Sequence, residues 1–297
     1  MSDVPAVLVT GASSGIGAAC AQRLDAAGMR VFAGVRREAD ATGLASRCSS
    51  RLTPLRLDVT DAESIASAAA AVSGAVGAHG LHGLVNNAGV SGGDPVEFAD
   101  LDAVRAMLEV NLVGPMAVTK AFLPRVRAAR GRIVCIGSIG GRFAVPFLST
   151  YSASKAGVAA FCDSLRVELA PWGIRVVLIE PGAVATAIWS KGRATLDERQ
   201  ATLPASATAL YGGAVEAMRR VTERVERTAV SPDRVARVVE RALTAAHPRS
   251  RYLVGVDAHL QAALRRLPTP VRDTVLVRAM GLPRRPDGSP PDRPSVS

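Results

Sequence analysis

The chain has 297 residues, of which 48% are hydrophobic and 4% aromatic, and its formal net charge at pH 7 is +10. This composition excludes a wholly disordered chain and allows one large α/β domain with an aliphatic core. The sequence contains no run of about 18 apolar residues, so we expect no membrane-spanning helix.

Short aliphatic runs alternate with longer, alanine-rich stretches of helical periodicity from the amino terminus onward. This pattern predicts strands at 4–10, 30–35, 52–59 and 81–89, and helices at 15–28, 38–47 and 60–77. Gly28 should end the first helix, and Thr60 with Glu63 fits a capping box at the start of the third.

The same alternation continues through the second half of the chain. A long helix is expected from about Leu101 to Ala129, kinked or locally ended at Pro115 and Pro124. Further helices should follow Ser149 and span 231–246, and strands should lie at 131–138, 173–182 and 251–255. Fully apolar strands that alternate with helices predict a single-domain Rossmann fold, a doubly wound seven-stranded parallel sheet with helices on both faces.

Two segments interrupt this rhythm. Residues 187–230 are expected to form a lid or insertion within a domain that spans 1–281. The tail 282–297 is rich in proline, serine and charge, which predicts disorder. The segment 259–282 has an amphipathic, basic character and is divided by prolines; we favour packing against the body or a partner subunit over contact with a membrane surface.

The basic residues and the cysteines limit the choice of partner and compartment. The cations form no dense block and lack interleaved aromatics, so no nucleic-acid partner is expected. The four cysteines show no metal-ligand or C-x-x-C spacing, which predicts reduced thiols and no metal site. The amino terminus has no basic region before its apolar stretch and is not typical of a secretory signal, so we expect a cytoplasmic location.

The first predicted strand runs directly into a glycine-rich turn, TGASSGIG at 10–17, which opens the first helix. Backbone N–H groups in such a turn and the helix amino terminus favour a pyrophosphate, although glycines also mark plain tight turns. In an alternating α/β pattern the turn predicts dinucleotide binding. The residues expected to contact the cofactor here are Gly11, Ser13, Ser14, Gly15, Ile16 and Gly17.

The second predicted strand ends in Arg36 and Arg37, and the first acid follows only at Glu38. In doubly wound folds an acid at this position binds the ribose 2′-hydroxyl of NAD, whereas an arginine suits the 2′-phosphate of NADP. We therefore predict a preference for NADP(H), with NAD(H) possible. The alternative is that both arginines are ordinary surface charges.

At this point an ordered set of motifs resembles the short-chain dehydrogenase/reductase (SDR) family over about residues 4–255. The stretch 137–169 looks like the hydroxysteroid and retinol dehydrogenase branch. The motifs are TGASSGIG (10–17), Asp58-Val59, NNAG (86–89), Asn111, Ser138, Tyr151-x-x-x-Lys155 and Pro181-Gly182.

The resemblance implies roles for several residues and a homodimer or homotetramer. Asp58, with Val59, would hold the adenine, and Asn111 would bind a water in a proton relay, unless it is only a buried amide. NNAG could likewise be only a turn. The remaining residues implied to line the cofactor are Asn87, Ala88 and Gly89 on the adenosine side, and Pro181, Gly182, Val184 and Thr186 near the nicotinamide.

Tyr151 and Lys155 are four residues apart on a predicted helix and therefore share one face. With three tyrosines and three lysines in the chain, chance would place only about 0.03 such pairs. A nearby ammonium favours the phenolate, so Lys155 should lower the pKa of Tyr151 toward the range useful for proton transfer. Ser138, at the end of a predicted strand, can donate to a substrate oxygen. These features predict a catalytic site, in which the resemblance implies that Tyr151 and Lys155 also contact the cofactor.

The loop between Ser138 and Tyr151 carries Phe143 and Phe147, which we expect to border the substrate together with the two catalytic hydroxyls. An apolar carbonyl or alcohol substrate follows, of steroid, retinoid, fatty or polyketide type, unless some of these side chains pack beneath the loop. The predicted function is an NADP(H)-dependent oxidoreductase. The alternatives are a noncatalytic NADP-binding sensor on the same scaffold and a peripheral membrane protein.

Overall fold

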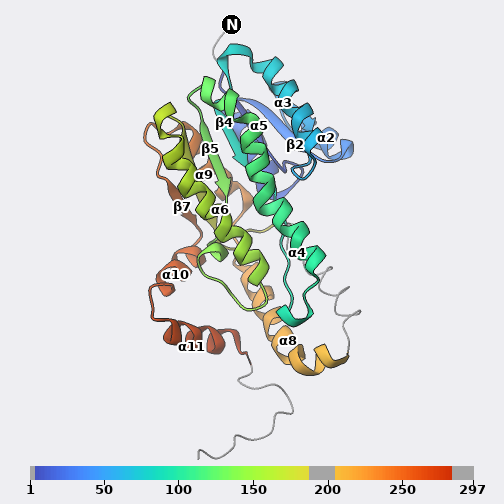
Figure 1. The fold of residues 1–297 in the computed structure, drawn as a ribbon, viewed down its shortest axis with the longest axis vertical. Coiled ribbons are helices and arrows are strands. Elements are labelled where there is room, and N and C mark those ends of the chain that lie inside the picture. The colour runs from blue at the N-terminus through green and yellow to red at the C-terminus, as the bar shows by residue number, and fades with distance from the viewer. Residues whose placement is uncertain (1–3, 187–204, 283–297) are drawn as a thin grey trace, which may run out of the picture.

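Seven parallel strands form the centre of the computed structural model, which describes residues 4–186 and 205–282 (Figure 1). Their order in the sheet is β3-β2-β1-β4-β5-β6-β7, which confirms the predicted doubly wound fold. The chain reverses direction across the sheet between β1 and β4, so the carboxyl ends of these strands border the crevice where such sheets bind ligands. The strands are β1 (Ala6–Val9), β2 (Arg30–Val35), β3 (Leu52–Arg56), β4 (Gly83–Asn86), β5 (Arg132–Ile136), β6 (Arg175–Pro181) and β7 (Arg251–Val254).

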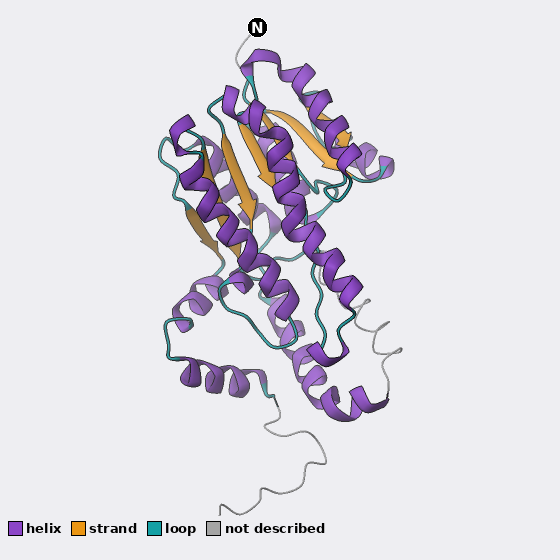
Figure 2. Cartoon of the chain, in the orientation of Figure 1, coloured by secondary structure: helices purple, strands orange, loops and turns teal. Residues whose placement is uncertain are grey.

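Helices cover both faces of the sheet because the strand side chains alternate between two apolar layers. In β1, Val7 and Val9 join one buried cluster, while Ala6 and Leu8 join the other. The first cluster is covered by α1 (Gly15–Ala26), α2 (Glu38–Ala45) and α9 (Pro232–Thr244). Figure 2 shows the opposite face, where α3 (Ala62–Val76), α5 (Gly114–Ala128) and α6 (Ser149–Glu168) cross the strands.

The long helix expected at 101–129 is present, and Pro115 does not end it. It comprises α4 (Leu101–Leu108), a π-helical turn η3 (Glu109–Val113) and α5, with Pro124 inside α5. A π turn just before Pro115 accommodates a residue that cannot donate a helical hydrogen bond. Leu101–Ala128 is long and apolar enough to cross a membrane, by length and composition alone. Such a helix was not expected from the sequence. Three of its apolar side chains, Val118, Phe122 and Val126, are instead buried in the core.

One predicted helix start is wrong by a single residue. The N-cap of α3 is Asp61, whose carboxylate accepts from the backbone N–H groups of Glu63 at 2.9 Å and Ser64 at 3.3 Å. Thr60 instead donates to Asp58. Two other expected boundaries are confirmed, with Gly28 at φ 86° directly after the C-cap of α1 and Ser231 at the N-cap of α9.

The carboxyl-terminal elements lie beyond the end of the sheet (Figure 1). Of the expected insertion 187–230, residues 187–204 lie outside the described residues, and α8 (Ala205–Arg227) forms most of the rest. After β7 come α10 (Val256–Leu264) and α11 (Thr269–Met280), separated at the predicted prolines. Of the expected tail 282–297, only Leu282 is described. Within 4–186 and 205–282 there are also four short 3-10 turns: η1 (Gly77–His79), η2 (Val96–Phe98), η4 (Ile139–Gly141) and η5 (Ala170–Trp172).

Candidate active site

The glycine-rich turn lies between the carboxyl end of β1 and the amino end of α1. Gly11 and Gly15 have φ values of 64° and 55°, which favour glycine. The N-cap residue Ser14 makes no side-chain cap bond, and the first turn of α1 carries no acid. The first N–H groups of α1 therefore face an approaching anion with the positive helix end behind them, so the turn fits a cofactor phosphate.

Thr10 and Asn87 fasten this turn to the end of β4. The Asn87 side-chain amide donates to the carbonyls of Thr10 at 2.9 Å and Gly11 at 3.1 Å. The Thr10 hydroxyl accepts from the N–H groups of Asn87 and Ala88, both at 3.0 Å. Gly17 packs here so closely that a Cβ would lie 2.2 Å from the Gly11 oxygen. NNAG thus holds the glycine-rich turn in place, and its contact with a cofactor stays a prediction. The sequence did not single out Thr10 as the structural partner that makes this attachment.

The two arginines after β2 differ in their surroundings, although both are exposed. Arg37 grips the Asp40 carboxylate through two hydrogen bonds of 2.9 and 3.0 Å. Arg36 instead acts electrostatically on Asp58, at the end of β3. A cavity of about 620 Å³ opens beside them, with Arg56 as a third cation in its wall and Val35 and Leu55 among its apolar lining. Glu38 also lines this cavity, and Arg36 is the arginine less committed to a neighbour.

Asp58 is held in a turn that keeps its carboxylate ionised. Its Oδ1 accepts from the N–H of Thr60 at 3.0 Å and from the Thr60 hydroxyl at 2.8 Å. Burial opposes ionisation, but these two hydrogen bonds, with the charges of Arg36 and Arg56, lower the pKa of Asp58 below its ordinary value. The neighbouring Val59 side chain is 7% exposed and packs beside Gly114.

Ser138, Tyr151 and Lys155 come together at the carboxyl end of β5. Ser138 is the N-cap of η4, and its hydroxyl accepts from the N–H of Gly140 at 3.0 Å. A Cβ at Gly140 would lie 3.3 Å from both the Ser138 Oγ and the Tyr151 ring, so the turn holds the two side by side. The Lys155 ammonium lies 5.9 Å from the Tyr151 ring centroid and donates to the Ile136 carbonyl at 3.1 Å.

Burial dominates the electrostatics of this group. It lowers the pKa of Lys155 to about 8, a shift that Cys135 opposes. Burial also raises the pKa of Tyr151, which a hydrogen bond with Ser138 counteracts. The expected lowering of the Tyr151 pKa by Lys155 is therefore wrong for this structure, in which the opposing influence comes from Ser138.

Asn111 lies in the π turn and is 1% exposed, with its side chain engaged on both sides. Its Oδ1 accepts from the N–H of Val90 at 2.8 Å, and its Nδ2 donates to the Val90 carbonyl at 2.9 Å and the Ser154 hydroxyl at 3.0 Å. These contacts fit the alternative of a buried, satisfied amide that fixes the loop after NNAG. The implied relay water stays a prediction. Gly89 adjoins this site, since a Cβ there would lie 3.4 Å from the Lys155 ammonium.

The segment after β6 reaches back to the glycine turn. A Cβ at Gly15 would lie 3.0 Å from the Thr186 methyl group, so the two predicted cofactor segments meet. Val184 forms a bridge with Val230, next to α8. The Asp257 carboxylate accepts from the N–H of Ala183 at 2.7 Å and would clash with a Cβ at Gly182, directly after Pro181. Asp257 was not predicted, because it lies 74 residues from the group it holds.

Phe143 and Phe147, both expected to border the substrate, have different surroundings. Phe143 is 4% exposed, which fits the alternative that its ring packs beneath the loop, and its contact with a substrate stays a prediction. Phe147 has a φ of 65°, rare for an aromatic residue, and its ring meets the edge of Tyr211 on α8 at a centroid distance of 6.4 Å. Tyr211 also contacts Phe98 at 5.8 Å and donates to Glu97 at 2.9 Å. Part of the expected lid thus packs on the Phe147 loop.

Known proteins resemble this chain along most of its length. A family model described as short chain dehydrogenase matches residues 5–197. Human retinol dehydrogenase 5 is 40% identical over 260 residues, which cover 86% of this chain and 81% of that protein. Bovine 17-beta-hydroxysteroid dehydrogenase type 6 is 40% identical over 283 residues, covering 93% and 89%.

Two solved structures share the architecture. A short-chain dehydrogenase from Streptomyces avermitilis superposes with a TM-score of 0.74 at 28% identity, covering 94% of this chain and 97% of that one. A short chain dehydrogenase from Burkholderia cenocepacia J2315, in complex with NADP, gives 0.69 at 26% identity, covering 95% and 100%. None of these likenesses supports the expected cytoplasmic location or tests the expected oligomer.

Proposed function

The chain belongs to the short-chain dehydrogenase family and is an oxidoreductase, and we propose that it moves a hydride between NADP(H) and an apolar carbonyl or alcohol. The observation that carries the proposal is the convergence of Ser138, Tyr151 and Lys155 at the end of β5. The glycine turn that fits a phosphate lies at the same edge of the sheet, two strands away. Strand ends at this edge are where doubly wound folds bind ligands.

In this proposal Tyr151 is the general acid and base. Its hydroxyl delivers a proton to the oxygen that becomes an alcohol in reduction, and takes that proton back in oxidation. The Ser138 hydroxyl donates a hydrogen bond to the same oxygen and so polarises a bound carbonyl. Lys155, beside the Tyr151 ring, is proposed to contact the cofactor, while the hydrogen bond from Ser138 opposes the burial that raises the pKa of Tyr151. The nicotinamide supplies or accepts the hydride.

We infer a preference for NADPH from the arginines after β2. Arg36 can grip a 2′-phosphate with two hydrogen bonds, whereas Arg37 would have to share its guanidinium with Asp40. A related structure with NADP bound is compatible with this choice. Fluorescence titration should give a lower Kd for NADPH than for NADH; tighter NADH binding would contradict the assignment.

The substrate class follows from the relatives and from the aromatic cluster. Relatives at about 40% identity are named for retinol and for a 17-beta-hydroxysteroid. The rings of Phe98, Phe147 and Tyr211 provide an apolar wall of the kind that such ligands need. We therefore propose a steroid-, retinoid-, fatty- or polyketide-like alcohol or ketone as substrate. Separately, we propose an assembly of two or four copies, as the family resemblance implies.

The proposal is tested by a panel of carbonyl and alcohol substrates followed by NADPH absorbance. Tyr151→Phe removes the only proposed proton donor while keeping the ring, so turnover should fall at least about 100-fold, with the Kd for NADPH nearly unchanged. Near wild-type turnover in that variant would refute the role of Tyr151. If the wild-type protein bound NADPH but turned over no substrate, the noncatalytic sensor would become the better proposal.

A further inference from the structure

A buried carboxylate lies directly behind the proposed catalytic turn. Glu180, the sixth residue of β6, is 1% exposed. Its Oε1 accepts from Arg142 Nε at 2.7 Å, while Oε2 is buried with no hydrogen-bond partner among the described residues. Burying an ionised carboxylate costs several kcal/mol unless cations offset that cost. An apolar side chain of similar volume would stabilise the fold at least equally. A charge at this position therefore calls for a role beyond packing.

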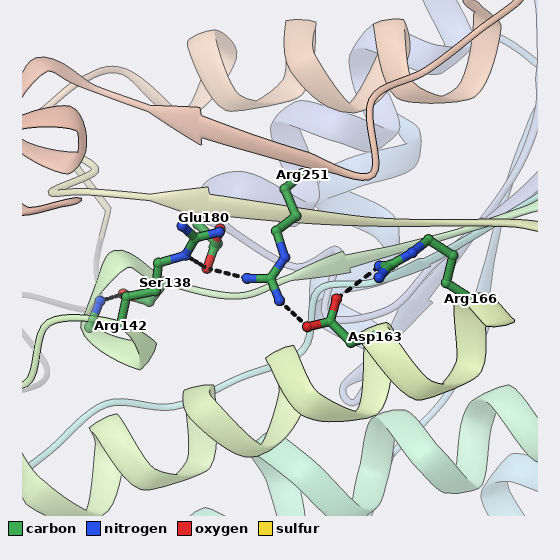
Figure 3. A network of polar contacts seen from close by, with 7 residues as sticks. Ser138, Arg142, Asp163, Arg166, Glu180 and Arg251 are labelled. Carbon is green, nitrogen blue, oxygen red and sulfur yellow. Dashed lines mark hydrogen bonds and ion pairs between the residues drawn. The ribbon is translucent and has the colours of Figure 1, made fainter. Parts of the chain in front are cut away.

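The first partner of Glu180 belongs to the turn that carries Ser138. Arg142 directly follows η4, and its backbone N–H donates to the Ile139 carbonyl at 2.9 Å, as does that of Phe143. Ser138 begins the same turn, and a Cβ at Gly140, in its middle, would lie 3.3 Å from the Tyr151 ring. Figure 3 shows the Glu180 carboxylate reaching Arg142 beside Ser138. Glu180 thus holds one end of a turn whose other end presents a proposed catalytic hydroxyl.

The second partner connects Glu180 to the helix that carries Tyr151 and Lys155. Arg251, on the edge strand β7, lies between two carboxylates in Figure 3. Its Nη1 is 3.5 Å from Glu180 Oε1, and its Nη2 binds Asp163 on α6. Arg166, one turn further along α6, donates to the same aspartate at 2.8 Å. The chain of charges therefore joins β6, β7, η4 and α6.

We propose that Glu180 is a positioning residue for the proposed oxidoreductase reaction, holding the Ser138 turn against Tyr151 through Arg142. The proposal rests on the proposed function, because it concerns how well Ser138 and Tyr151 meet one substrate oxygen. Such geometry matters, since a displacement of about 1 Å can cost on the order of 100-fold in rate. Glu180 also directly precedes Pro181 and Gly182, the segment expected near the nicotinamide.

The test combines Glu180→Gln with Ser138→Ala in a double-mutant cycle. Glu180→Gln keeps the shape of the side chain but removes its charge, and kcat/KM should fall about 10- to 100-fold, while the Kd for NADPH changes less than about threefold. Because Glu180 acts through Ser138, the same change in the Ser138→Ala background should cost less than about threefold. Equal losses in both backgrounds, or an unchanged kcat/KM, would overturn the proposal.

A matched control separates positioning from general loss of stability. Arg23→Gln breaks the Arg23–Glu240 ion pair of 2.5 Å, which joins α1 and α9 rather than the elements that carry Ser138 and Tyr151. It should lower the Tm and leave kcat/KM unchanged. If Arg23→Gln reduced turnover as Glu180→Gln does, the effect would be one of stability, and the positioning role would fail.

Hydrogen exchange gives a readout that needs no turnover. In Glu180→Gln, peptides covering 138–143 should exchange faster than in the wild-type protein, and in Arg23→Gln they should not. Unchanged protection of these peptides would refute the positioning role even if no substrate had been found. A wild-type protein without turnover but with this local response would instead contradict only the proposed function.

Discussion

Two titratable side chains, Tyr151 and Lys155, show how much burial decides at the residue scale. The sequence pairs them by spacing, which led to the expectation that the ammonium would lower the pKa of the phenol. In the structure, burial moves both groups toward their neutral forms, raising the pKa of Tyr151 and bringing that of Lys155 to about 8. The proposed proton donor is therefore held in its protonated form at neutral pH, as the proposed reduction requires.

Lys155 should cost stability near neutral pH. With an ordinary pKa of 10.5 and a folded pKa of about 8, it is charged in both states below pH 8, and its burial then costs about 3 kcal/mol at most. Lys155→Met should therefore raise the free energy of unfolding by about 2 kcal/mol at pH 7, after loss of the bond to Ile136 is subtracted.

The pH dependence checks the sign of this effect. The cost of the lysine disappears as pH rises from its folded to its unfolded pKa, so the advantage of Lys155→Met should shrink between pH 8 and about 10.5. Denaturant unfolding at several pH values measures it. An advantage that stays constant or grows over this range would contradict the assigned direction of the shift.

At the scale of elements, the contact between α8 and the Phe147 loop is the one that bears on substrate. Phe147 has a strained backbone at φ 65°, and the Tyr211 ring packs against it while the Tyr211 hydroxyl binds Glu97. Strain of this kind persists only where neighbours hold it. α8 therefore fixes the loop that leads from Ser138 to Tyr151.

Variants of Tyr211 separate the ring from the hydroxyl. Tyr211→Ala should raise KM for an apolar substrate at least about fivefold, because the aromatic contacts with Phe98 and Phe147 are worth about 1 kcal/mol each. Tyr211→Phe keeps both ring contacts and should stay within about twofold of wild type. The Kd for NADPH should not change in either variant. If Tyr211→Phe raised KM as much as Tyr211→Ala does, the hydrogen bond from the Tyr211 hydroxyl to Glu97 would be responsible instead.

At the scale of the whole molecule, the carboxyl-terminal helices combine support for the site with an exposed apolar surface. Asp257 on α10 holds the turn after β6. On α11, Val271 and Val275 are 49% and 37% exposed, one helical turn apart, with Arg278 nearby. We propose two alternative roles for this face of α11: contact with a membrane surface, or packing against a second copy of the chain.

Substitutions in α11 test that face better than truncation, because removing α10 would also remove Asp257. If the surface binds anionic lipid, the wild-type protein should sediment with vesicles containing phosphatidylserine, and Val271→Glu with Val275→Glu should reduce the bound fraction several-fold without changing NADPH binding. Equal sedimentation of both proteins, or none by either, would argue against this role. Light scattering would then show whether the double variant, Val271→Glu with Val275→Glu, dissociates an assembly.

The sequence by itself determined the order of strands and helices, the doubly wound class and the proposed catalytic residues. These depend on local periodicity, on turn-forming glycines and on short spacings such as Tyr151 to Lys155, all of which lie within a few residues of chain. Helix caps were less secure, as the shift from Thr60 to Asp61 shows, because neighbouring polar residues compete for the same N–H groups.

Only the tertiary structure decided what surrounds those residues. It buried Phe143, engaged the Asn111 side chain with Val90, and brought Asp257 to Ala183 and Glu180 to Arg142 across 74 and 38 residues of chain. Such contacts join strand ends and loops that are adjacent only once the sheet has formed, and burial, which shifts both pKa values at the site, exists only in the packed molecule.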